Sequence, residues 1–171
     1  MGSEQSGPPS NSLTDVMESV VPTTWGEIGR VGRYFRHHPT LDPRTREIAI
    51  LQVTISTRCV YAYAHHVRIL ERELAVMEVT LRALIDHAIG GASRVSEDDA
   101  SVMHAARRIS EEAGLDIAEL DDLGRALGRV QASELVTAVA FYNCLARIAN
   151  AFDVPLEPEY SSTVDRFPTP W

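Results

Sequence analysis

The segment Leu41–Ile69, LDPRTREIAILQVTISTRCVYAYAHHVRI, carries the local signals that decide the fold. Its second and third residues are aspartate and proline, the pairing of an N-cap residue with proline at the first helical position. Apolar residues then recur at spacings of three and four, at Ile48, Leu51 and Ile55, as they do along an amphipathic helix. Another helix is expected at about Tyr61–Leu74. The segment therefore predicts two consecutive helices.

The remainder of the chain is divided by capping residues, glycines and prolines into further helical stretches. It shows no strand pattern beside them and no internal repeat. The expected further helices cover about Gly26–His37, Thr80–Ile89, Ser96–Glu112, Asp116–Leu127 and Ser133–Ala151. We therefore expect an all-α fold, a bundle of about six to seven helices.

Composition divides the 171 residues into one domain and two tails. Residues 1–12 are rich in glycine, proline and serine, and we expect them to be disordered. Residues 13–158 are expected to form a single helical domain, which is long enough to bury a core. Residues 159–171 follow as a second tail, in which the proline content argues against a helix.

Net charge and residue usage exclude several classes of function. The formal net charge is −8 and the basic residues are scattered, so we expect no nucleic-acid partner. All 16 basic residues are arginines, and without lysine a Schiff base, a pyridoxal phosphate anchor and a P-loop are excluded. No apolar run is long enough for a membrane span, and the start of the chain lacks the pattern of a signal peptide. We therefore expect a cytoplasmic protein without a membrane partner, in which both cysteines are thiols.

The stretch RCVYAYAHH combines a cysteine with two adjacent histidines. On a helix, Cys59, Ala62, Tyr63 and His66 would share one face. The two histidines would not face each other, because neighbouring helical residues point in different directions. No further pair of ligands at metal spacing lies near them in the sequence. We therefore expect no metal ion and no cofactor.

A thiol near an imidazole can form a nucleophilic cysteine, but the spacing argues against direct contact here. Seven residues at a rise of ~1.5 Å place Cys59 and His66 about 10 Å apart along the helix axis. The residue that would have to bridge them is Ala62, which has no polar group. Packing of Cys59 in the core is therefore the alternative interpretation.

Glu47 lies within an apolar run and is expected to be buried. A buried ionised carboxylate is costly unless it is paired. Arg44 and Arg46 are possible partners at the helix surface. His66 on the next helix is the functional alternative, because a carboxylate can orient an imidazole and raise its basicity.

Together these residues resemble the carboxymuconolactone decarboxylase and alkylhydroperoxidase D-like (AhpD-like) superfamily, whose members are all-α and form homo-oligomers. The resemblance runs from about Phe35 to Pro158 and includes the late stretch FYNCLARIANAFDVPLEP. In the peroxidase branch, a glutamate lies twelve residues before a C-x-x-C-x-x-x-H motif. The resemblance places that glutamate on Glu47, the first cysteine on Cys59 and the histidine on His66.

The chain departs from this pattern at the centre of the motif. The second, peroxide-reactive cysteine of the peroxidases falls on Ala62. Other members carry C-x-Y-E-W-x-x-H, with a glutamate at that place. This chain keeps Cys59, Tyr61 and His66 and has Tyr63 for the tryptophan, but it lacks the glutamate too. The small side chain of Ala62 is expected to leave room for a pocket.

The leading hypothesis is a cofactor-independent enzyme that transfers protons on a small carbonyl or carboxylate substrate by decarboxylation, isomerisation, or cyclisation or elimination. His66 would be the acid or base and Glu47 its orienting partner, with tyrosines stabilising an enolate-like state. The expected substrate-binding residues are Tyr61, Ala62, Tyr63 and His65. One alternative is a thiol peroxidase or redox protein that uses Cys59, and another is a relative that binds a small molecule without catalysis. In each case we expect a homo-oligomer.

Overall fold

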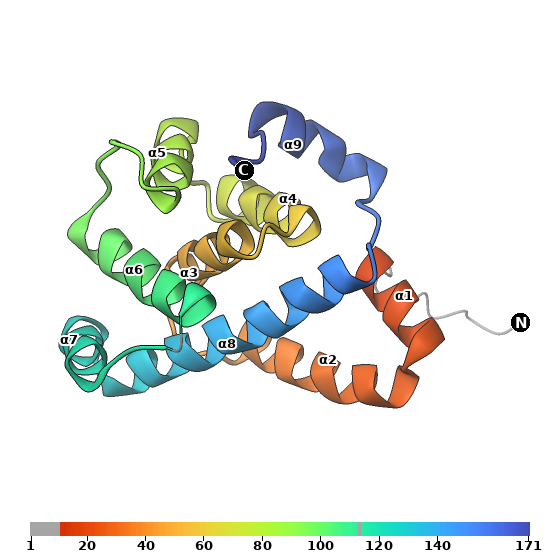
Figure 1. Cartoon of the computed structure of the whole chain (residues 1–171), viewed down its shortest axis with the longest axis horizontal. Coiled ribbons are helices and arrows are strands. Elements are labelled where there is room, and N and C mark those ends of the chain that lie inside the picture. The colour runs from red at the N-terminus through yellow and green to blue at the C-terminus, as the bar shows by residue number, and fades with distance from the viewer. Residues whose placement is uncertain (1–10, 113) are drawn as a thin grey trace, which may run out of the picture.

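The structure is a computed structural model that describes residues 11–112 and 114–171. Within these ranges the chain forms α-helices and no strand, so the all-α prediction is confirmed (Figure 1). The disorder expected for residues 1–12 is wrong for Asn11 and Ser12, which cap and begin the first helix, and residues 1–10 lie outside the described part. The helices are α1 Ser12–Val20, α2 Pro22–His37, α3 Pro43–Ser56, α4 Val60–Arg68, α5 Glu78–Ala88, α6 Glu97–Glu111, α7 Ile117–Leu127, α8 Arg129–Ala151 and α9 Ser161–Arg166.

Helix α3 is the central element of the fold and packs against α4, α6 and α8. Every residue from Glu47 to Ile55 is buried, including the polar Gln52 and Thr54, so this helix is covered on all sides and not on one face as an amphipathic helix would be. Its start follows the predicted cap, because the Asp42 carboxylate accepts a hydrogen bond from the Thr45 amide at 2.9 Å. The sequence places Glu47 on this helix, so its carboxylate enters the interior.

A sharp connection joins α3 to α4 and decides where α4 begins. Arg58 adopts a left-handed backbone with φ of 52°, and Cys59 then caps α4 with an extended backbone. The helix expected at Tyr61–Leu74 consists of α4 followed by a π-helical turn at Ile69–Glu73. The helix therefore starts after Cys59, which separates this cysteine from the helical face that follows.

The described residues form nine α-helices, so the expected number of about six to seven was too low. Two helices were missed. The local signal for α1 was present: Asn11 accepts a hydrogen bond from the Thr14 amide at 2.9 Å, and Leu13 and Met17 are buried one turn apart. The two missed helices are α1 and α9.

The expectation of no helix in residues 159–171 is wrong. The prolines flank α9 instead of interrupting it, and Pro158 begins a 3₁₀ turn, Pro158–Tyr160, at a position where its missing amide proton is not needed. Phe167, directly after α9, is 1% exposed and belongs to the main core. The expected tail therefore packs on the domain and extends it.

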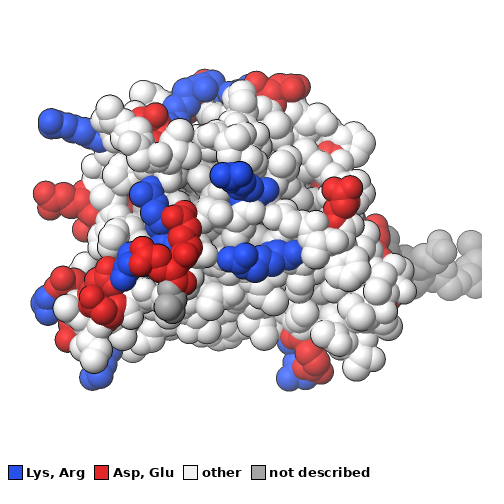
Figure 2. Space-filling view, in the orientation of Figure 1, with Lys and Arg blue, Asp and Glu red and all other residues white. Residues whose placement is uncertain are grey.

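The surface mixes both signs of charge over α6 and α7. Figure 2 shows acidic and basic side chains side by side on this part of the face in view. Arg108, for example, donates from its Nε to Glu119 at 3.0 Å. In the described part of the chain, no helix is both long and apolar enough to cross a membrane.

Candidate functional site

A cavity of about 390 Å³ lies beside α3 and α4 and is also lined by α1, α2 and α8. Its volume is within the range of small-molecule binding sites. Five of the residues predicted from the sequence line it: Glu47, Tyr61, Ala62, His65 and His66. The structure therefore brings most of the predicted site together around one cavity.

His66 and Glu47 form a short hydrogen-bonded pair at this cavity. The Nδ1 atom of His66 lies 2.6 Å from Oε2 of Glu47, and their side chains are 12% and 3% exposed. No described residue hydrogen-bonds the other ring nitrogen, Nε2 of His66. The imidazole is therefore held by one nitrogen, while its second nitrogen remains available to a ligand.

The second carboxylate oxygen of Glu47 is paired with Arg46. The Nε atom of Arg46 donates to Oε1 of Glu47 at 3.0 Å, and its NH1 donates to the carbonyl of Phe35 at 2.8 Å. Arg44 instead pairs with Asp99, so the partners of Glu47 are Arg46 and His66. Of the three partners considered from the sequence, two therefore pair with Glu47 and Arg44 does not.

The charges around Glu47 keep it ionised. Burial raises the pKa of Glu47, but the nearby His66 and Arg46 outweigh that effect and bring the pKa below its ordinary value. When His66 is neutral and its Nδ1 proton is donated to the ionised Glu47, the lone pair of the imidazole lies on Nε2. This is the tautomer that a general base requires.

Tyr142 of α8 is a site residue that the sequence reasoning missed. Its ring meets the ring of His66 edge to face, with centroids 5.2 Å apart, and it lines the cavity. Burial raises the pKa of Tyr142 to about 12, so the hydroxyl keeps its proton at neutral pH. The only sequence signal was its position in the late helical stretch FYNCLARIANAF.

A second hydrogen-bonded cluster surrounds His65. The Nε2 atom of His65 lies 2.9 Å from Oε2 of Glu157, and the Tyr61 hydroxyl donates to Oε1 of Glu157 at 3.2 Å. The ring of Tyr160 stacks on His65 with centroids 3.8 Å apart. Burial lowers the pKa of His65, although the hydrogen bond to Glu157 acts in the opposite direction. His65 is therefore neutral at pH 7 and donates its Nε2 proton to Glu157.

Two predicted residues, Cys59 and Tyr63, do not line this cavity. Cys59 is fully buried in a cluster with Leu13 and Met17 of α1, and burial raises the pKa of its thiol. The Cys59 sulfur accepts from the Ala62 amide at 3.5 Å, as a helix cap. Tyr63 points into the main core, where its pKa is raised to about 12 by burial. The residues that were expected to share one face of the helix therefore lie in three different environments.

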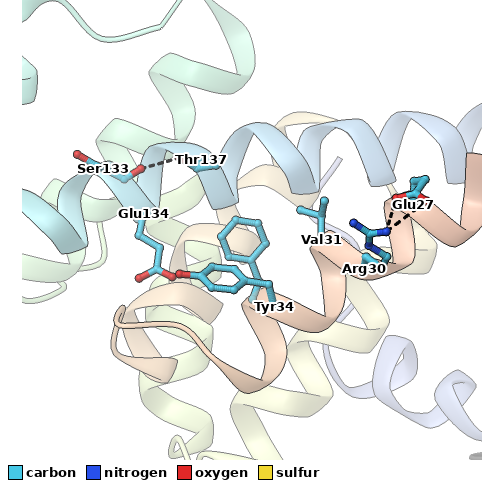
Figure 3. A pocket seen from close by; sticks show the side chains of 8 residues that line it. Glu27, Arg30, Val31, Tyr34, Ser133, Glu134 and Thr137 are labelled. Atoms are coloured by element: carbon cyan, nitrogen blue, oxygen red, sulfur yellow. Dashed lines mark hydrogen bonds and ion pairs between the residues drawn. The ribbon is translucent and has the colours of Figure 1, made fainter.

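A larger hollow, of about 560 Å³, lies between α2 and α8 but holds no comparable pair. Figure 3 shows Tyr34 of α2 and Glu134 of α8 pointing toward each other there. Oε2 of Glu134 accepts from the amides of Thr40 and Leu41 at 2.8 Å, so this carboxylate holds the chain before α3 in place. No histidine is among the residues that line this hollow, and its second carboxylate, Glu27, is paired with Arg30.

A comparison with known protein families identifies the family of the chain. The sequence model of the carboxymuconolactone decarboxylase family matches residues 21–107, about half of the chain, and the chain therefore belongs to this family. The matched segment contains Glu47 and His66. Helices α1 and α8 and the stretch around Glu157 lie outside it. The resemblance noted from the sequence is thus confirmed. No curated protein matches the chain.

Proposed function

We propose that this protein is a cofactor-independent enzyme that transfers protons on a small carbonyl or carboxylate compound. The observation that carries the proposal is the pairing of His66 with a buried, ionised Glu47, with Nε2 of His66 unengaged at a cavity of suitable size. The family includes members with different chemistries, so the argument depends on these groups and not on the fold.

In the proposed step, Nε2 of His66 removes a proton from a carbon next to a carbonyl group. The electron pair of the broken C–H bond forms a C=C bond, and the π electrons of the carbonyl group move to its oxygen, which gives an enolate-like state. The imidazolium that results is stabilised by Glu47, and it can return the proton to another atom of the substrate, which completes an isomerisation. In an elimination, the electron pair instead expels a leaving group.

Tyr142 is the tyrosine best placed to stabilise the developing oxyanion. It lies against His66, and its hydroxyl donates to no described residue. The two tyrosines expected from the sequence are occupied elsewhere, because Tyr61 donates to Glu157 and Tyr63 points to the carbonyl of Pro168 at 3.4 Å. A neutral hydroxyl donor near a developing negative charge lowers the barrier without a change in net charge.

Arg36 supplies a positive charge that suits a carboxylate substrate. It lines the cavity from the last turn of α2 and forms no ion pair within the described residues. Its charge reaches the interior, since it lowers the pKa of Tyr142 against the effect of burial. Arg46, the other cavity-lining arginine, is already paired with Glu47. Arg36 is therefore the group proposed to hold an anionic substituent of the substrate.

The proposal is tested by hydrogen exchange on candidate substrates. A panel of small keto acids and lactones is incubated with the enzyme in D₂O, and loss of the proton next to the carbonyl is followed by NMR. The variant His66→Gln should exchange ~10²–10⁴-fold more slowly than the wild type on any compound that the wild type labels. His104→Gln, which changes a largely exposed histidine on α6, is the control. Equal exchange by His66→Gln and the wild type would remove His66 from the mechanism.

A further inference from the structure

Glu157 joins three parts of the chain that are far apart in sequence. Its Oε1 accepts from the Ser12 amide at 2.7 Å and from the Tyr61 hydroxyl at 3.2 Å, while its Oε2 lies 2.9 Å from His65. Burial raises the pKa of Glu157, but these donors outweigh it and bring the pKa to about 2, so the carboxylate is ionised. One charged group therefore connects the start of α1, helix α4 and the stretch before α9.

The elements joined by Glu157 contribute to the wall of the cavity. Asn11 and Leu13 line it from the start of α1, and Tyr160 lines it from the 3₁₀ turn. The Tyr61 hydroxyl also accepts from the Leu13 amide at 3.4 Å, which adds a second link between α1 and α4. Asn11, Leu13 and Tyr160 lie outside residues 21–107, the segment that the family model matches, whereas Tyr61 lies within it.

The two adjacent histidines have different environments at the same cavity. His65 lies between two tyrosine rings, with centroids 4.5 Å from Tyr61 and 3.8 Å from Tyr160, and its Nε2 is engaged by Glu157. His66 has its Nε2 unengaged by the described residues. The guanidinium of Arg68 lies over the Tyr160 ring, 4.6 Å from the ring centroid. His65 is thus part of a layered stack that shapes the wall, while His66 lines the cavity with one ring nitrogen unengaged by the described residues.

We propose that Glu157 is a positioning residue that completes the substrate cavity by fixing α1, His65 and Tyr160 as one wall. This inference rests on the proposed function, since it takes the cavity to be the substrate site. The wall determines the size and shape of ligand that the cavity admits, whereas the proton-transfer pair, His66 and Glu47, does not depend on it. His65 accordingly acts through its packing and does not exchange protons with the substrate.

The test compares Glu157→Ala and Glu157→Gln with a matched control, Glu159→Gln. The control removes the same charge two residues away, from a carboxylate that bonds to no described side chain. The probe is diethyl pyrocarbonate, which modifies unprotected imidazole nitrogens, and modification of each histidine is measured by peptide mass spectrometry. In Glu157→Ala we expect His65 to react about tenfold faster than in the wild type, with His66 changed less than twofold. The control should match the wild type at both positions.

Two further measurements separate positioning from general stability. Hydrogen–deuterium exchange should accelerate at the Ser12 and Leu13 amides in Glu157→Ala and remain unchanged in α3. The ¹⁵N spectrum of the His65 imidazole should show the Nε2–H tautomer in the wild type and a mixture of tautomers in Glu157→Ala. Glu157→Gln should lie between the two, because its amide oxygen still accepts from Ser12, and it serves as the test if the alanine variant does not fold.

Unchanged reactivity of His65 in both Glu157 variants would overturn the proposal, as would exchange that accelerates equally throughout the helices. None of these measurements requires turnover. They therefore fail or succeed independently of the exchange assay on His66→Gln, which tests the proposed function itself.

Discussion

Replacement of Glu47 by glutamine tests the pair at the centre of the site. The wild-type side chain is 3% exposed and uses both oxygens, one for His66 and one for Arg46. Glutamine preserves the volume but has a single acceptor oxygen and no charge. The Arg46 guanidinium, 11% exposed, therefore loses its only carboxylate partner among the described residues.

The expected loss of stability follows from this unpaired charge. Removal of one partner of a buried ion pair costs about 3–5 kcal/mol, and the retained acceptor places Glu47→Gln at the lower end, ~3 kcal/mol. For a chain of this size, ~1 kcal/mol shifts the melting temperature by about 2–4 °C. We therefore expect the melting temperature to fall by about 6–12 °C.

The expected loss of activity follows from the tautomer of His66. The glutamine amide can donate to Nδ1 of His66, which moves the imidazole proton to Nε2 and removes the lone pair from the cavity. The same reversal in a catalytic triad costs about 10⁴ in rate, and we expect a loss of ~10²–10⁴ in the deuterium-exchange assay. A ¹⁵N spectrum of the imidazole would report the change of tautomer directly.

The measurements are calorimetry, the exchange assay and the imidazole spectrum, with Glu27→Gln as the control. Glu27 pairs with Arg30 on the surface, where its side chain is 68% exposed, so the same chemical change should cost less than ~0.5 kcal/mol. If Glu47→Gln kept the wild-type melting temperature and the Nε2 lone pair of His66, the reasoning from the buried pair would be refuted.

The remaining predictions concern the thiols, pH and assembly. A stoichiometric dose of hydroperoxide should leave Cys59 titratable after denaturation, because it is buried and its thiol pKa is raised; rapid loss reversed by a dithiol would instead favour the redox alternative. The free energy of unfolding should fall on acidification in two ranges, measured by urea titration at several pH values. The pKa of His65 in the folded state is below the ordinary 6.5, so on acidification the unfolded state binds this proton before the folded state does. The loss of stability therefore begins below about pH 6.5. Glu157 has a folded pKa of about 2, below the ordinary 4.5, so its contribution is complete above pH 4.5 and is lost as the pH falls toward 2. Other carboxylates, such as Glu47, also have a lowered pKa, so Glu157→Gln should make this second fall smaller without removing it. Light scattering at micromolar concentration should show a homo-oligomer, and a strict monomer would contradict that prediction.

Local signals predicted seven of the nine α-helices that the described residues form, and they identified Glu47. Asp42 and Pro43 mark the start of α3 because capping depends only on neighbouring residues. Glu47 was identified because a carboxylate within an apolar run must find a partner in the interior. Its pairing with His66 spans 19 residues and two consecutive helices, a separation that the helical periodicity and the family resemblance could bridge.

The face of α4 was predicted less well, for a reason that lies in the backbone. The expected face assumed an uninterrupted helix from Cys59, whereas the left-handed turn at Arg58 makes Cys59 a cap. Tyr63 was assigned to the pocket, but the main core and the C-terminal segment cover it. Nothing in the local spacing distinguishes the core side of a helix from the cavity side when both are aromatic.

The sequence by itself determined the helical class and the position of α3, and it offered His66 as one of several possible partners of Glu47. The tertiary structure alone decided which groups surround the Glu47–His66 pair. Glu157 lies 92 residues from His65, between two prolines, and its neighbours carry no pattern that assigns it a partner. Tyr142 likewise reaches His66 only because α8 packs against α4. Helix formation depends on residues a turn apart, whereas the walls of a cavity depend on how distant segments pack, and short-range periodicity does not encode that packing.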